Sequence, residues 1–147
     1  MGIVRHLQHW LGGKGPRINV RDFVPKDHYL RLWADTFPWE KMVEVVDASI
    51  TRRFPKETVQ GRSPVSTRVL LTLELLKAEL HCSDEQICSR LRTDVAVMYA
   101  CGIEAVQADP AQGHFVLSEV LAQFRSRLDE HEMLKEEGME YFRKLLR

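Results

Sequence analysis

Polar and basic side chains near position 125 are of the types that read DNA bases. Gln123, Arg125 and Arg127 lie at alternate positions, and a helix would present them, with Ser118, opposite its apolar seam. Glutamine can pair with the edge of adenine and arginine with the edge of guanine in the major groove. We therefore take Ser118, Gln123, Arg125 and Arg127 as candidate base-reading residues. An ordinary solvated helix has the same composition, and composition alone favours that interpretation.

A second basic group lies between positions 52 and 68, where Glu57 is the single acidic residue. Arginine and lysine bind phosphate oxygens without reading sequence, although a charge run is more often a solvated face. The segment from Phe54 to Pro64 has two prolines and one glycine, which predicts a loop from which the cluster protrudes. The candidate phosphate-contacting residues are Arg52, Arg53, Lys56, Arg62 and Arg68.

Motifs that carry catalysis are absent from the sequence. It has neither a GxxxxGK[ST] loop nor a GxGxxG element after a strand, and no HExxH motif. Glu40, Glu44 and Asp47 have the spacing of one solvated helix face. We therefore expect no catalytic residue, no metal ligand and no cofactor in this chain.

The three cysteines are odd in number and have no CxxC spacing. Reduced, mostly buried thiols in a cytoplasmic protein are the favoured interpretation. A zinc site from His81, Cys82, Cys88 and Cys101 is the alternative. Its geometry is poor, because two adjacent residues rarely supply two tetrahedral ligands.

The elements that must position these residues are organised around the stretch Gly61–Leu91. Val69, Leu73, Leu76 and Leu80 recur at helical spacing, and further leucines widen the stripe to most of the circumference, which is typical of a central helix. Ser63-Pro64 or Ser66 can begin this helix. Ser83 with Gln86 has the form of a capping box for the next helix. Helix, break and capped helix fit a helix-turn-helix or any helical bundle.

The remaining periodicity predicts helices and no strands. Residues 1–22 have no helical or strand period, so we expect a flexible basic arm before a single helical domain over residues 23–147, which the resemblance described below makes a DNA-binding domain. The expected fold is all-α, a compact bundle of about six to seven helices with a helix-turn-helix-like unit. Besides the two central helices, the expected ranges are 25 or 27 to 37, 38–53, 95–101, 115–131 and 133–146. Both tryptophans in the first two of these are expected in the core, and Leu117, Leu121, Phe124 and Leu128 form the buried seam of the helix from 115.

Composition and charge limit the class of protein. A chain of 147 residues with 44% hydrophobic and 29% charged residues is an ordinary soluble globular protein, and no apolar run is long enough to cross a membrane. The formal net charge is zero, which excludes a uniformly basic nucleic-acid binder and predicts modest DNA affinity. Basic residues exceed acidic ones in the first eighty positions and the reverse holds afterwards, as a one-sided anionic partner would need.

Several short motifs follow one another along residues 24–128. They begin with VPKDHYLRLWADTF at 24–37 and continue with Gly61-Arg62-Ser63-Pro64, Leu70-Leu71-Thr72-Leu73-Glu74-Leu75-Leu76, Ser83-Asp84-Glu85-Gln86-Ile87, Cys101-Gly102-Ile103, and Ser118 followed by Phe124-Arg125-Ser126-Arg127-Leu128. This ordered series resembles the N-terminal domain of bacterial insertion-sequence transposases of the DDE class.

The resemblance implies a helical module that binds double-stranded DNA at the terminal inverted repeats of a mobile element. It also implies a separate ribonuclease-H-like domain with a metal-binding Asp-Asp-Glu triad, for which a divalent metal such as Mg²⁺ is expected. That domain is expected to be missing from this chain, which would not cut or join DNA alone. The helix with the FRSRL sequence is the expected reader, and the region 84–101 its support.

A helical protein–protein interaction module is the alternative function. It would oligomerise, for instance as a homodimer, or contact another protein through the acidic segment that includes Asp129, Glu130, Glu132, Glu136, Glu137 and Glu140. A third alternative is a small helical enzyme or regulator with an unrecognised ligand pocket.

Overall fold

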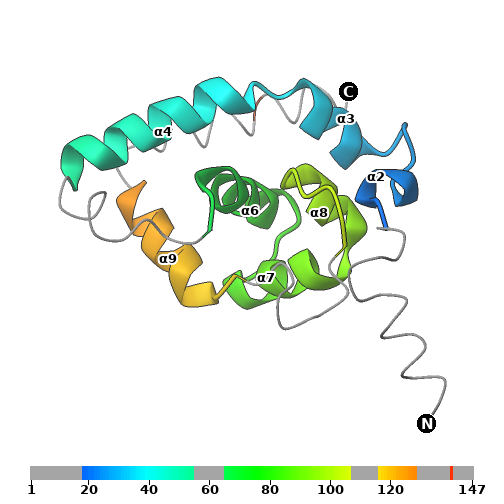
Figure 1. Ribbon diagram of the computed structural model, residues 1–147. Coiled ribbons are helices and arrows are strands. Elements are labelled where there is room, and N and C mark those ends of the chain that lie inside the picture. The colour runs from blue at the N-terminus through cyan, green and yellow to red at the C-terminus, as the bar shows by residue number, and fades with distance from the viewer. Residues whose placement is uncertain (1–17, 55–64, 107–115, 129–139, 141–147) are drawn as a thin grey trace, which may run out of the picture.

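The computed structural model describes residues 18–54, 65–106, 116–128 and 140. Within these ranges it contains helices and no strands, so the predicted all-α class is confirmed (Figure 1). The helices are α2 (Val20–Phe23), α3 (Tyr29–Thr36), α4 (Trp39–Arg53), α6 (Thr67–Glu79), α7 (Asp84–Thr93), α8 (Val95–Ala100) and α9 (Ser118–Arg127).

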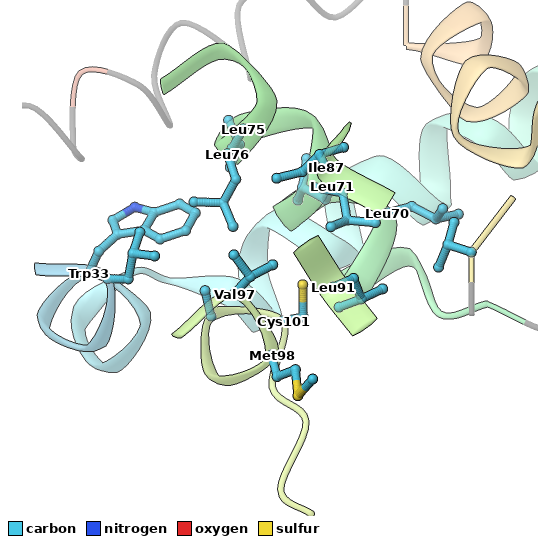
Figure 2. Packing of buried hydrophobic residues seen from close by; sticks show 14 of the residues in the cluster. Trp33, Leu70, Leu71, Leu75, Leu76, Ile87, Leu91, Val97, Met98 and Cys101 are labelled. Carbon is cyan, nitrogen blue, oxygen red and sulfur yellow. The ribbon is translucent and has the colours of Figure 1, made fainter. Parts of the chain in front are cut away.

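Helix α6 lies at the centre, with α4, α7 and α9 packed around it (Figure 1). All seven residues from Leu70 to Leu76 are buried, as the broad leucine stripe predicted. Side chains of α3, α6, α7 and α8 meet in this core, where Leu76 lies near Trp33 and Leu71 near Ile87 (Figure 2). Burying one such leucine contributes about 2 kcal/mol. The hydroxyl of Ser66 accepts from the amide of Val69, so Ser66 caps α6.

The break between α6 and α7 is a tight turn over residues 80–83. His81 adopts a left-handed backbone with φ of 53°, a conformation that non-glycine residues seldom adopt. The predicted capping box is confirmed, because the Gln86 amide donates to the Ser83 hydroxyl and the Ser83 amide to the Gln86 side chain. Asp94 then caps α8 directly after α7, accepting from the amides of Ala96 and Val97.

Three aromatic side chains hold the α3–α4 corner. The ring of Trp33 meets that of Trp39 edge-on at 5.0 Å between centroids, and Phe37 lies 4.4 Å from Trp39. Both tryptophans are buried, as predicted. Helix α3 begins at Tyr29, later than predicted, because the side chain of His28 accepts from the amide of Leu30 and caps it there. It ends before Pro38, as the restriction on pre-proline residues requires.

Two sequence predictions at the edges of the fold are wrong. Residues 18–22 belong to the folded body rather than to an arm: Val20 is completely buried, and its amide donates to the carbonyl of Glu104 at 3.0 Å while the amide of Val106 donates to Ile18. Such pairing between distant segments leaves no periodic signal in a short stretch. Leu117 is 48% exposed at the cap of α9 because that helix begins three residues later than expected.

Several other expectations fall on residues outside the described ranges. These include residues 1–17 of the predicted arm, most of the 54–64 loop and nearly all of the helix over 133–146. None of the helices in the described ranges has the length and apolar character needed to cross a membrane.

Candidate nucleic-acid interface

The carboxyl ends of α4 and α9 converge on one side of the molecule (Figure 1). A guanidinium nitrogen of Arg53 donates to the carbonyl oxygen of Arg127 at 2.6 Å. The guanidinium groups of Arg53 and Arg127 both lie over the ring of Phe54, 5.3 and 5.9 Å from its centroid. The ring thus holds two like-charged groups together through cation–π contacts.

Arg52 extends this group as an exposed side chain on the last turn of α4. We call Arg52, Arg53, Arg127 and Phe54 the arginine cluster. Basic residues are favoured in the last turn of a helix because the helix dipole is negative there, which is a local reason for their position at two helix ends. Arginine presents a planar fork of donors that matches phosphate oxygens. The cluster therefore has the chemistry of a phosphate-binding surface.

Two of the predicted base-reading residues lie in different halves of α9. Gln123 is exposed and lies one helical turn before Arg127, so the two share a face of α9. Ser118, at the first turn of the same helix, is half-buried. Gln123 thus lies on the same face of α9 as Arg127, whose carbonyl accepts from Arg53, a residue that the sequence had assigned to phosphates.

Arg125 faces the opposite way, into the protein. Its two terminal nitrogens donate to both carboxylate oxygens of Asp84 at 2.7 and 2.9 Å, and one also donates to Glu74 at 3.0 Å. Lys77 lies 2.8 Å from Asp84 and 3.5 Å from Glu74. These contacts lower the pKa of Asp84 and raise the pKa of Arg125, in each case chiefly through the hydrogen bond between them. The Arg125 side chain, expected on the solvated face of α9, is only 32% exposed, because the carboxylate of Glu74 is buried on α6 and needs a counter-charge.

Arg68 also departs from the predicted protruding cluster. Its guanidinium lies 3.8 Å from the ring centroid of Trp39 and donates to the carbonyl of Ala100 at 2.8 Å. Burial lowers its pKa to about 10. Arg68 therefore lies apart from the arginine cluster, and Lys56 and Arg62 fall outside the described residues.

A second basic surface was missed by the sequence interpretation. Helix α7, which follows α6 across the tight turn, exposes Ser89, Arg90, Arg92 and Thr93 on its outer side. The sequence already indicated this surface, because Ile87 and Leu91 mark the buried face of the helix and these four residues lie outside that face. Phe54 was missed as well, because only the convergence of α4 and α9 gives that ring two arginines.

The cysteines have no metal-binding arrangement in the part of the chain that the structure describes. No group of three or more potential ligands is found there. All three thiols are free, with Cys88 and Cys101 buried. Burial raises the pKa of Cys88 to about 11 and that of Cys101 to about 12, so both are protonated at neutral pH. The predicted buried thiols are confirmed for these two, whereas Cys82 is half-buried.

The helical core and its arginine-bearing ends make up a small all-α domain. The sequence model of the family described as "Transposase domain (DUF772)" matches residues 18–127, more than half of the chain. The chain belongs to this family. No curated protein and no solved structure matches it.

Proposed function

We propose that this chain is the DNA-binding module of a DDE-class transposase and that it recognises the terminal inverted repeats of a mobile element. Family membership supports a transposase-related role. The observation that carries the DNA-binding proposal is the arginine cluster, where two helix ends place Arg53 and Arg127 together over the ring of Phe54, with Arg52 exposed on the last turn of α4.

In this proposal the cluster binds the phosphate backbone and α9 lies along the groove. Arg127 contacts phosphate, while Gln123, one turn earlier, points at base edges. Arg125 acts as an anchor rather than a reader, since its donors are bound by Asp84 and Glu74. The zero net charge fits a few localised phosphate contacts better than a broad electrostatic surface.

Salt dependence of DNA binding tests this proposal. Fluorescence anisotropy with a duplex carrying the terminal repeat should give a plot of log affinity against log salt with a slope of about −3, since each phosphate contact contributes roughly −0.9. Arg52→Ala should reduce the slope by about 1 and weaken all sequences alike. Lys41→Ala is the matched control, because it removes an equal charge from an exposed position on the first half of α4.

Sequence preference is tested separately from affinity. Gln123→Ala should reduce the preference for the repeat over a scrambled duplex by about 1–3 kcal/mol, the value of one good base contact. Arg90→Ala tests the competing assignment, in which α7 rather than α9 reads the bases. A loss of preference on changing Arg90, with Gln123→Ala unchanged, would transfer the reading role to α7. A flat salt response, or no binding at low salt, would refute the proposal as a whole.

We further propose that the chain does not cut or join DNA by itself, because the resemblance assigns those steps to a separate Asp-Asp-Glu domain. Incubation of the purified chain with a repeat-bearing plasmid and Mg²⁺ should leave the plasmid supercoiled. Nicking that increases with protein concentration and disappears with EDTA would contradict this.

A further inference from the structure

A pocket of about 500 Å³ opens between α2, α3, the start of α6 and the residues after α8. Helices α2 and α3 both pack against α8, away from the α4–α9 convergence (Figure 1). Its polar lining residues are Asn19, Arg21, Asp35, Arg68, Tyr99 and Glu104. The pocket is of the size that holds a small ligand, and none of these residues belongs to the arginine cluster.

Arg68 is the unusual residue of this lining. Its guanidinium is held between the ring of Trp39 and the backbone of Gly102, where a β-carbon would lie 3.5 Å from the central guanidinium carbon. One terminal nitrogen donates to the carbonyl of Ala100, while the Nε–H is buried and meets no acceptor among the described residues. The Arg68 side chain is half-buried, and a charge that is partly removed from water is costly unless an opposite charge compensates it. Its contacts among the described residues are a ring and a neutral carbonyl.

Arg68, which lies on α6, and Arg125, which reaches α6 from α9, have different partners. Arg125 is bound by the carboxylates of Asp84 and Glu74, and its pKa is raised. Arg68 has no carboxylate within ion-pair distance in the described part of the chain, and burial lowers its pKa to about 10. It remains charged at neutral pH. An anion entering the pocket would supply the missing counter-charge.

A second cation lies at the rim of the same pocket. Arg21 is exposed and lines the pocket together with Tyr99. Its positive charge lowers the pKa of Tyr99, which burial raises overall. The position of its backbone is set by Arg31, which donates to the Arg21 carbonyl at 3.1 Å. The amide of Asn19 adds a neutral donor to the lining.

The acidic residues of the lining differ in their effect. Asp35 accepts the hydroxyl of Tyr99 at 2.6 Å and lies 3.9 Å from Arg31, so its charge is largely compensated. Glu104 is exposed. Its backbone carbonyl accepts a hydrogen bond from the amide of Val20. The side chain of Glu104 is therefore the group that opposes an anion.

We propose that this pocket binds a phosphomonoester, with Arg68 and Arg21 as the two charged donors. A phosphomonoester is close to a dianion above its second pKa of about 6, which matches two arginines, and the planar guanidinium suits phosphate oxygens. The ligand is either a free phosphate compound or the phosphorylated end of a nucleic-acid strand. The site does not depend on the arginine cluster and can be tested without duplex DNA.

Titration calorimetry with inorganic phosphate at about pH 7.5, with ionic strength held constant by NaCl, tests the site. Wild-type protein should bind saturably in the millimolar range. Arg68→Gln and Arg21→Gln should each weaken binding about tenfold, as expected for the loss of one charge-assisted hydrogen bond, whereas Lys26→Gln should leave it unchanged. Glu104→Gln should tighten binding severalfold.

Arg21 and Glu104 are exposed, so their variants remain informative should Arg68→Gln fail to fold, as judged by circular dichroism. No saturable binding to wild-type protein, equal affinity for acetate, or unchanged binding in Arg21→Gln would overturn the proposal. Short single strands with a 5′-phosphate or a 5′-hydroxyl distinguish the sources. Tighter binding of the phosphorylated strand than of inorganic phosphate assigns the site to strand ends, and equal binding assigns it to free phosphate.

Discussion

Replacing Arg125 by alanine tests whether this side chain anchors α9 or reads DNA. The change removes an ion-pair partner from the buried carboxylate of Glu74, which keeps Lys77 at 3.5 Å, and it removes the two hydrogen bonds that Arg125 donates to Asp84. Removing one partner of a buried ion pair costs about 3–5 kcal/mol. The Arg125 side chain is 32% exposed, and solvent screening lowers this to about 2–4 kcal/mol.

Urea denaturation followed by circular dichroism measures this loss in the free energy of unfolding. Glu74→Gln in the Arg125→Ala background removes the buried charge that has lost Arg125 and should recover about 1–2 kcal/mol, a coupling that a double-mutant cycle isolates. Arg90→Ala, which removes an exposed arginine from α7, should change stability by less than about 0.5 kcal/mol.

An Arg125→Ala protein with unchanged stability but lost preference for the terminal repeat would refute the anchoring role. It would return Arg125 to the base-reading group. Absence of rescue by Glu74→Gln would show that the buried charge is not the cause of the loss.

Three further results are expected from the same fold. Asp84 has a folded pKa well below its unfolded value of about 3.9, so its contribution to the free energy of unfolding is present above about pH 4 and is lost as the pH falls below that value. In acid denaturation, Asp84→Asn should therefore lose stability less steeply than wild type in that range. An identical pH profile would contradict the ion pair. Ser83→Ala breaks the capping box and should cost about 1 kcal/mol in urea denaturation, with Ser89→Ala on the exposed side of α7 as control. Leu73→Ala, at a position with no exposed surface, should cost about 2–5 kcal/mol, and a smaller loss would mean that α6 is not the packing centre.

Local signals along the chain were sufficient for the helices and their caps. Leucines at helical spacing predicted the central position of α6, and Ser83 with Gln86 predicted the start of α7, because both depend on residues within a few positions of one another. Ser66 and Ser63-Pro64 were equally good starts by local chemistry, and the hydrogen bond to Val69 shows that Ser66 is used.

The candidate sites depend on contacts between distant segments, and these only the tertiary structure decided. Composition places Arg125 and Arg127 in the same candidate group. In the structure Arg125 binds the buried carboxylate of Glu74, 51 positions earlier, whereas the carbonyl of Arg127 accepts from Arg53, 74 positions earlier. Arg68 belongs by sequence to the basic cluster and by structure to a pocket with Arg21. Sequence determines which helices form and which side chains carry charge. The direction in which each charge faces depends on which helices pack together, because a buried carboxylate or an aromatic ring becomes a partner only when packing brings it near.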